Sequence, residues 1–331
     1  MTLFIQKSSP TFLKSALPAA LAAMALSLTA CSKADEGGTV AVPKAPETSA
    51  PAAAATSDKA GIDIGMLDGG RSVQSFDSPP GYQRDAKILT YEGPGWESDK
   101  VGYRLYLDGR NVLDIFGKKT PGIVLPKVGR GEDYHAMADW GMDILKVGNS
   151  LGAGGWGVFK AGKAVQVGNA DSYSARVVED TEDTATLEVT LKNAGECKAD
   201  MTTTYKINAG ERLTHINVAG DCARPVAAGI VIHPGTEKLA SGGKKGWQYI
   251  ARYGAQSLVP DNLGIALFYN ASFAAGVSDD LDDSYVTFRR TGNVEYFTGA
   301  AWAQEGGGIT DEAGFQAWLT ETQAALNASA K

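Results

Sequence analysis

Apolar and polar residues alternate one by one over several stretches of this chain, and this pattern restricts its fold more than any other feature. Between positions 184 and 192 the apolar side chains are Ala185, Leu187, Val189 and Leu191, and polar residues separate them. A strand whose successive side chains point to opposite faces of a sheet gives this period of two. One apolar and one polar face is typical of an antiparallel sheet packed in a sandwich.

Short strands joined by turns are expected along most of the chain. Glycine is abundant, with 40 residues among 331, and turn-forming dipeptides recur about every ten residues. The further strands that we expect lie at 102–106, 112–116, 175–179, 227–233, 246–252, 264–269 and 285–290. We therefore predict an all-β fold, a large antiparallel β-sandwich that forms a single domain over residues 61–331.

Residues 311–327 depart from this pattern and predict a C-terminal helix. The residues that recur at helical spacing are Phe315, Trp318, Leu319, Thr322 and Leu326. This spacing puts them on one face of a helix. Asp311 and Glu312 stand where a helix start favours acidic residues. We expect this helix to pack on a sheet edge.

Two cysteines, Cys197 and Cys222, flank a predicted β-hairpin. Residues 208–211 suit a tight turn, and a two-residue loop at 209–210 sets a register in which the cysteines face each other. Opposed cysteines bridge only where the geometry suits them, and an oxidising compartment permits the bond. We predict a structural disulfide that clamps the hairpin. Two free buried thiols are the alternative.

The start of the chain has the features of a processing signal. Lys7 and Lys14 precede an apolar run, and residues 21–31 read LAAMALSLTAC. This run is too short and too rich in alanine for a stable spanning helix, and it resembles the lipobox of bacterial lipoproteins. The resemblance implies a signal peptide over residues 1–30, cleavage before Cys31 and lipid attachment to that cysteine. A leader cut elsewhere and an uncleaved anchor are the alternatives.

Residues 31–60 are predicted to form a disordered tether between the lipid and the folded domain. They have almost no large apolar side chains and cannot bury enough surface to offset the entropy of ordering. We expect the protein outside the cytoplasm, held on a membrane by Cys31, and Ser32 favours the outer membrane of a Gram-negative cell. The net charge of −7 argues against a nucleic-acid partner, and we expect a monomer.

Two long motifs carry a resemblance to a known family. They read WESDKVGYRLYLDGRNVLDIFGKK at 96–119 and DYHAMADWGMDILKVGNSLGAGGWG at 133–157, and HPG follows at 233–235. Together they resemble DUF4861, a family of extracytoplasmic bacterial proteins of unknown function. The resemblance implies a β-supersandwich like that of galactose mutarotases and several polysaccharide lyases. It also implies a place among genes for the breakdown of acidic polysaccharides, pectin above all. It supplies no established catalytic residue.

The motif region is dense in the side chains that an acidic sugar needs. A uronate glycan requires cations for its carboxylates, aromatic faces for its rings and polar groups for its hydroxyls. The candidate substrate-binding residues are Trp96, Arg104, Tyr106, Arg110, Lys118, Lys119, Asp139, Trp140, Asp143 and His215. Alternation places Arg104 and Tyr106 on one strand face, as a compact pair. The alternatives are a solvated face for the charges, core packing for the tryptophans and a solvent-facing role for His215.

The candidate catalytic groups are Tyr134, His135 and His233. Histidine titrates near neutral pH, and a neighbouring tyrosine can pair with it in proton transfer. Tyr134 and His135 are expected in a loop, where sites on a rigid β scaffold often form. If that stretch were helical, His135, Asp139 and Asp143 would share a face. His233 ends an apolar strand; a core histidine bonded to a turn carbonyl is the alternative there.

Cofactor chemistry has little support in the sequence. HExxH, paired metal-binding cysteines and GxSxG are all missing from it, and the glycine-rich run 148–157 lacks the ending of a phosphate loop. Close backbone approach or a mobile flap is the expected role of that run. The acidic run Asp279, Asp280, Asp282 and Asp283 indicates calcium only weakly, because it lacks the glycine and distal glutamate of a calcium loop. We expect no metal site and no cofactor.

These observations favour a membrane-tethered, carbohydrate-active protein that acts on acidic, pectin-like oligosaccharides by β-elimination or isomerisation. Elimination needs a cation to neutralise the uronate carboxylate and a base to remove the adjacent proton. The hypothesis therefore requires cations and a proton acceptor from distant segments to meet in one cleft. The alternatives are a non-catalytic glycan-binding accessory lipoprotein and a scaffold held at the membrane.

Overall fold

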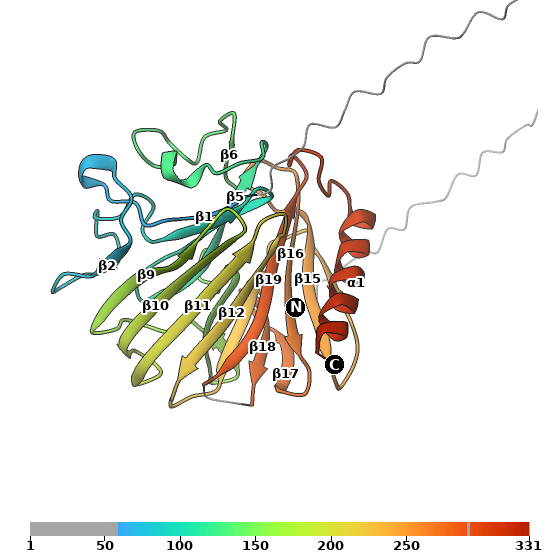
Figure 1. Cartoon of the computed structure of the whole chain (residues 1–331). Coiled ribbons are helices and arrows are strands. Elements are labelled where there is room, and N and C mark those ends of the chain that lie inside the picture. Colours follow the sequence, from blue (N-terminus) through green and yellow to red (C-terminus); the bar gives the residue numbers. More distant parts are fainter. Residues whose placement is uncertain (1–58, 290–291, 331) are drawn as a thin grey trace, which may run out of the picture. The chain divides into compact units, whose positions relative to one another are not determined.

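The computed structural model describes residues 59–289 and 292–330, which form three sheets, one α-helix and two short 3-10 helices, η1 (Asp68–Gly70) and η2 (Leu125–Lys127) (Figure 1). Cys31, the expected signal peptide and nearly all of the expected tether lie outside these residues. The chain enters its first strand at Ala60, which is the last residue of the expected tether. No helix within the described ranges is both long and apolar enough to cross a membrane.

The strands form one large and two smaller sheets. The nine-stranded sheet has the order β14 (Glu237–Ala240), β15 (Trp247–Ala255), β16 (Asn262–Asn270), β19 (Val294–Trp302), β12 (Leu213–Gly220), β11 (Ala199–Asn208), β10 (Thr184–Ala194), β9 (Ser172–Asp180) and β2 (Ser75–Asp77). The first five-stranded sheet has the order β1 (Ala60–Asp63), β3 (Gly95–Ser98), β4 (Val101–Leu105), β5 (Leu113–Lys118) and β6 (Gly141–Asp143). The second has the order β17 (Ala274–Asp279), β18 (Asp283–Phe288), β13 (Val226–Val231), β7 (Ala153–Lys160) and β8 (Lys163–Val165).

The two smaller sheets pack against the inner face of the large one. Apolar side chains from all three sheets share a single core. Two buried tryptophans of the smaller sheets also bond across it: Trp96 Nε1 donates to the Thr214 hydroxyl and Trp156 Nε1 to the Thr203 hydroxyl, each at 2.9 Å. These bonds satisfy indole donors that burial would otherwise leave unpaired. The predicted all-β sandwich is therefore confirmed.

The predicted C-terminal helix is also confirmed. Helix α1, Glu312–Ser329, begins after Asp311, whose side chain accepts a hydrogen bond from the Gly314 backbone N–H at 2.7 Å and so caps the first turn. Phe315 and Leu319 are fully buried in an apolar cluster on the outer face of the nine-stranded sheet. The helix thus covers the face of β15 and β16 and does not pack on the sheet edge (Figure 1).

The glycine-rich run before and within β7 allows close backbone approach, the first of its two expected roles. Gly154 has a φ of +100°, and a Cβ atom there would lie 2.4 Å from the Thr298 hydroxyl oxygen on β19. At Gly157 a Cβ atom would lie 2.0 Å from the Val165 carbonyl oxygen. A larger residue at Gly154 would force the two layers apart, and one at Gly157 would separate the neighbouring strands β7 and β8.

The hairpin of β11 and β12 forms with a register other than the predicted one. Ile207 faces Thr214, so the loop between the strands has four residues, 209–212, and the predicted two-residue loop is wrong. Gly210 N–H donates to Oδ1 of Asp99 at 2.6 Å, a contact with a distant strand end that holds the wider loop. Tertiary contact has therefore overridden the local preference for a tight turn.

The disulfide between Cys197 and Cys222 is confirmed. Cys197 lies in the turn before β11 and Cys222 directly after β12, so the bond closes the hairpin at its open end. Both side chains are buried.

Replacing both cysteines with alanine is expected to lower the free energy of unfolding by about 3 kcal/mol, because a crosslink over a sequence separation of 25 residues restricts the unfolded chain. Unfolding in urea measures this loss. A thiol reductant should weaken the wild-type protein by a similar amount and leave the double variant unchanged. Equal stability of the oxidised and reduced wild-type protein would contradict the prediction.

Candidate functional site

Arg104 is the centre of a buried polar cluster on the outer face of the first five-stranded sheet. Alternation along β4 directs Tyr103 into the core and Arg104 to the opposite face. The Arg104 side chain is 2% exposed, and its Nη2 lies 2.7 Å from Oδ2 of Asp114 on β5 and 2.7 Å from Oδ2 of Asp143 on β6. The pairing of these three strands therefore places one cation between two carboxylates.

Two tyrosines complete the surroundings of the guanidinium. Arg104 Nη2 donates to the Tyr106 hydroxyl at 2.6 Å, and Nη1 donates to the Tyr134 hydroxyl at 3.2 Å. The Tyr106 hydroxyl in turn donates to Asp114 at 2.9 Å. The guanidinium carbon lies 4.5 Å and 5.2 Å from the two ring centroids, within the range of cation–π attraction. Acceptors and ring faces thus hold the cation in one position.

Burial changes the proton affinity of Asp143. Burial, reinforced by the negative charge of Asp114, raises the pKa of Asp143 to about 8, although Arg104 acts in the opposite direction. The charge of Asp114 acts in this direction because two like charges held close together disfavour ionisation of the second group. Asp143 is therefore suited to hold a proton near neutral pH, a property that is frequent at catalytic sites.

His135 is where this cluster meets solvent. Its side chain is 54% exposed, Nε2 lies 3.5 Å from Oδ2 of Asp143, and Nδ1 lies 3.1 Å from Oδ1 of Asp133. The imidazole also lies against the ring of Tyr134, with centroids 4.3 Å apart. The backbone fixes this arrangement, because the Asp143 N–H donates to the Tyr134 carbonyl at 2.8 Å. An imidazole between a buried acid and solvent can accept and return protons.

The segment that carries His135 is a loop, so the hypothetical helical face with Asp139 and Asp143 is wrong. Residues 128–140 consist of turns and irregular backbone. Gly129 has a φ of +70°, which a right-handed helix does not allow. His135 and Asp143 nevertheless meet, because the loop folds back on β6.

The remaining predicted residues of this loop lie at its margin. Trp140 is half-buried, with its ring centroid 6.0 Å from that of Phe116. Its carbonyl accepts a hydrogen bond from the half-buried Lys119 at 2.8 Å. Asp139 is exposed and has no described partner. Trp140 and Lys119 therefore border the cluster, and Asp139 lies outside it.

Arg110 extends the network at its other end. The guanidinium lies over the Tyr106 ring, 3.9 Å from the centroid, and pairs with Asp108 at 2.6 Å and with Glu92 at 3.2 Å. Glu92 is 34% exposed and lines a pocket of about 280 Å³ together with Lys87. Its charge adds to the effect of burial on the pKa of the β6 aspartate, so this pocket is electrostatically connected to the cluster.

Two of the predicted substrate-binding residues are internal. Trp96 is fully buried and stacks on Tyr205 with centroids 4.6 Å apart, so it belongs to the sandwich core. The Lys118 side chain is also fully buried, and its Nζ lies 2.5 Å from Oε2 of Glu97. Neither side chain reaches solvent, and we therefore place both outside the site.

The three histidines lie at separate places. His215 is on the outer face of β12, with Nε2 2.7 Å from Oε1 of Glu295. His233 follows β13, and its Nε2 lies 2.8 Å from the Lys146 carbonyl oxygen. Within the described ranges, no hydrogen bond or ring contact links these two imidazoles to each other or to His135. Arg104 and His135 thus share Asp143 as a partner, whereas His233 and His215 lie apart from them.

Two aspartates of the acidic run that weakly indicated a calcium site are bonded to other groups of the protein. Asp279 pairs with Lys238 and Arg252, each at 2.7 Å, and Asp283 accepts a hydrogen bond from the Leu151 N–H at 2.9 Å. Among the residues that the structure describes, no group of three or more histidine, cysteine or acidic side chains is arranged to hold a metal ion.

Sequence reasoning misses two carboxylates of the network, Asp114 and Glu92. Asp114 interrupts the apolar run VLDIF, and a single charge in a buried strand indicates an internal partner. Glu92 has a φ of +66°, which is uncommon for a residue other than glycine, and nothing in the sequence marks it.

The fold and this cluster define the class of the protein: an all-β sandwich whose buried arginine–carboxylate network opens to solvent at a histidine. The chain belongs to the DUF4861 family, described as a domain of unknown function, whose family model matches residues 25–331. The resemblance carried by the two motifs is thereby confirmed. No curated protein and no solved structure matches the chain.

Proposed function

We propose that this protein is a carbohydrate-active enzyme that acts on uronate-containing, pectin-like oligosaccharides by proton transfer, through β-elimination or isomerisation. The observation that carries the proposal is the half-exposed His135 beside the buried Asp143, whose pKa is raised. We also propose that it works outside the cytoplasm, tethered by lipid on Cys31. The buried disulfide supports an oxidising compartment.

The residues of the cluster would have different roles in the proposed proton transfer. His135 would exchange the proton with substrate, because its imidazole is the exposed end of the network. Asp143, which holds a proton near neutral pH, would orient the imidazole, and the Tyr134 hydroxyl, held by Arg104, is a second acid within the same loop. Lys87, which lines the pocket that contains Glu92 and has no described partner, would meet the substrate carboxylate.

One observation favours a second candidate function, a non-catalytic glycan-binding accessory lipoprotein. Three of the cations expected to bind uronate carboxylates, Arg104, Arg110 and Lys118, are each paired with a protein carboxylate. Their charge is therefore compensated within the fold. A protein of this kind would bind sugar through other groups and would need no proton acceptor.

Two substitutions in the cluster test catalysis. His135→Gln and Asp143→Asn are each expected to lower turnover of polygalacturonate or its unsaturated oligomers by at least about 10²-fold, the usual worth of a general acid or base. Ultraviolet absorbance follows formation or loss of unsaturated uronate, and proton NMR follows isomerisation. Asp139→Asn on the same loop is the control and should leave turnover unchanged. Sugar binding without turnover by the wild-type protein, unaffected by His135→Gln, would establish the accessory role instead.

A further inference from the structure

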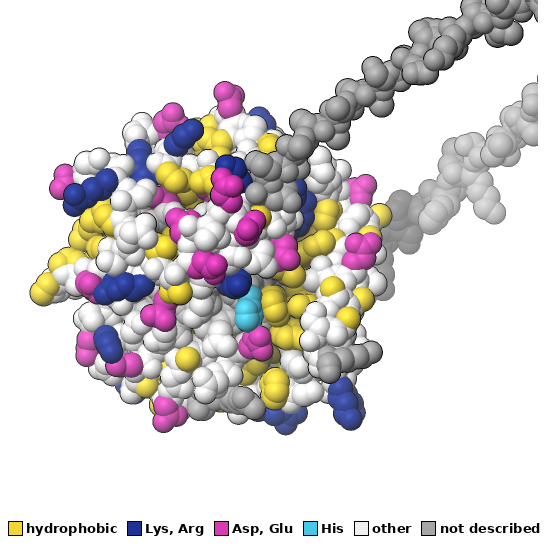
Figure 2. All heavy atoms as spheres, in the orientation of Figure 1, with side chains coloured by type: hydrophobic (Ala, Val, Ile, Leu, Met, Phe, Trp, Pro, Cys, Tyr) yellow, Lys and Arg dark blue, Asp and Glu magenta, His cyan; other side chains and the backbone are white. Residues whose placement is uncertain are grey.

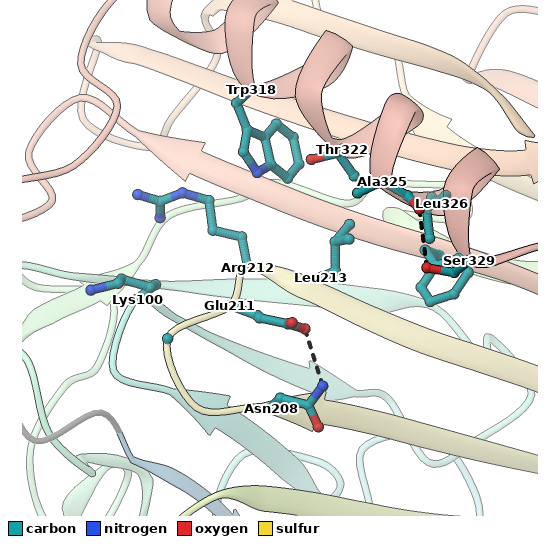
Figure 3. A pocket seen from close by; sticks show the side chains of 12 residues that line it. Lys100, Asn208, Glu211, Arg212, Leu213, Trp318, Thr322, Ala325, Leu326 and Ser329 are labelled. Atoms are coloured by element: carbon teal, nitrogen blue, oxygen red, sulfur yellow. Dashed lines mark hydrogen bonds between the residues drawn. The ribbon is translucent and has the colours of Figure 1, made fainter.

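A groove of about 500 Å³ lies between helix α1 and the turn that joins β11 to β12, on the nine-stranded sheet (Figure 3). Hydrophobic side chains gather on the molecular surface along the strip between the strands and the helix, as Figure 2 shows in yellow. The apolar wall of the groove includes Leu213 and Phe297 from the sheet and Trp318 and Leu326 from the helix. This groove is separate from the Arg104 cluster, with which it shares no residue.

Trp318 forms a fixed aromatic face in this groove. Its ring stacks on Phe315 with centroids 5.5 Å apart and meets Phe268 edge-on at 5.7 Å. The side chain is half-buried, and the structure describes no hydrogen-bond partner for its indole N–H or for the hydroxyl of Thr322, one turn further along the helix. Figure 3 shows these two groups side by side at the groove. A held aromatic ring with open polar groups beside it suits a ligand with both apolar faces and hydroxyls.

Two cations line one end of the groove, and each forms an ion pair with a buried carboxylate. Lys100 Nζ lies 2.7 Å from Asp99, and Arg212 Nη1 lies 2.7 Å from Glu305. The side chains of Asp99 and Glu305 are 0% and 5% exposed, that of Arg212 is 9% exposed, and that of Lys100 is 33% exposed. Lys100 is therefore the cation that the groove exposes to solvent, whereas Arg212 is nearly buried beside Glu305. A partly exposed ammonium group beside an aromatic face can attract an anionic group.

The groove continues past these cations. A second hollow of about 160 Å³ is lined by Lys100 and Arg212 together with their partners Asp99 and Glu305, and it extends to Thr120 and Pro121. At the opposite edge of the main groove, Glu211 is turned to Asn208, which donates to it at 3.2 Å. The surface thus offers an aromatic face, then two cations, then further space, along one trough.

We propose that this trough binds a carboxylate-bearing oligosaccharide, with one sugar ring against Trp318 and Leu213 and a carboxylate at Lys100. The inference rests on the proposed function for its ligand class, an acidic glycan, but it needs no catalysis. It assigns the protein a second, non-catalytic contact with the polymer, which would hold a chain while another part of it is processed.

Filling the trough tests this assignment. Ala325 is an exposed residue of α1 that lines the groove, and Ala324 is its exposed neighbour that does not. Ala325→Trp is expected to weaken binding of tetragalacturonate, measured by isothermal titration calorimetry, by at least about 10-fold, because a bulky side chain would occupy the sugar position. Ala324→Trp should bind as the wild-type protein does, and thermal unfolding should be unchanged in both variants.

Two further measurements, one on the charge of Lys100 and one on His135, distinguish binding in the trough from binding at the Arg104 cluster. Lys100→Gln should weaken tetragalacturonate binding and make it less sensitive to salt, while maltotetraose, a neutral counterpart, should bind more weakly to the wild-type protein. Unchanged binding in Ala325→Trp, or equal binding of the two sugars, would overturn the inference. Binding that depends on His135 but not on Ala325 would also overturn it and leave the proposed function standing. If the wild-type protein shows no turnover and Ala325→Trp loses binding, the result would support glycan binding in the trough and contradict the proposed catalytic activity.

Discussion

Arg104→Leu is expected to lower the free energy of unfolding by about 3–5 kcal/mol, because it leaves two buried carboxylates without their cation. Asp114 and Asp143 are 1% and 2% exposed in their side chains, and both lie 2.7 Å from the same guanidinium nitrogen. Leucine fills much of the volume but offers no donor. Urea unfolding at neutral pH, followed by tryptophan fluorescence, measures the loss.

The pH dependence of this loss distinguishes electrostatics from packing. The pKa of Asp143 is raised in the folded protein, so its contribution to stability is fully present below the ordinary carboxyl pKa and falls as pH rises toward about 8. Without Arg104 this fall should be steeper, and the variant should recover toward acidic pH.

An exposed arginine provides the control for this prediction. Arg176 pairs with Asp77 in a site where the two side chains are 40% and 71% exposed. Arg176→Leu should cost less than about 1 kcal/mol. A loss for Arg104→Leu no larger than that of the control, or one that does not change with pH, would contradict the electrostatic account.

The strands with the clearest alternation in the sequence are those with one solvated face. β10 and the hairpin of β11 and β12 alternate cleanly because one face meets the core and the other meets water. β19 gives no such signal, because it lies between β12 and β16 and most of its residues are buried on both faces. Periodicity therefore identifies strands with one solvated face better than strands that are covered on both faces.

Several residues of the candidate site could be predicted from the sequence, but the ion pairs between them could not. Alternation places Arg104 and Tyr106 on one face of β4, and the structure has them there. Nothing local shows that the cation is compensated, because its partners come from β5 and β6, 10 and 39 residues further along the chain. From composition alone, Arg104 is expected to be available to a ligand. Strand pairing instead places its charge beside two buried carboxylates.

The positions of aromatic residues and the conformation of loops are also difficult to predict from the sequence. Trp96 lies in the same motif as the cluster, yet alternation along β3 directs it to the core and to Thr214. The loop with His135 was open to a helical reading, because the spacing of its polar residues fits either form. Its outcome depends on a backbone hydrogen bond from Asp143 to Tyr134, which no periodicity encodes.

Lys118→Met is expected to have a comparable effect, about 3–5 kcal/mol, at the other end of β5. Lys118 and Glu97 are both fully buried, and the ammonium group also donates to the Ser98 carbonyl at 2.6 Å and to the Gly122 carbonyl. Methionine preserves the shape of the side chain but leaves the Glu97 carboxylate unpaired. Because burial already raises the pKa of Glu97, the variant should lose stability as pH rises through the neutral range.

A second substitution shows whether the unpaired charge is the cause. Glu97 Oε1 accepts the N–H groups of Val124 and Leu125 at 2.8 Å and 2.7 Å, and a glutamine carbonyl can accept the same bonds. Glu97→Gln combined with Lys118→Met should therefore recover at least about 1 kcal/mol of the loss, because the buried group is then neutral. Lys160→Met, next to the partly exposed Glu196, should cost less than about 1 kcal/mol. If the double variant is no more stable than Lys118→Met alone, the carboxylate is not what destabilises the protein, and the lost bonds to the loop carbonyls are.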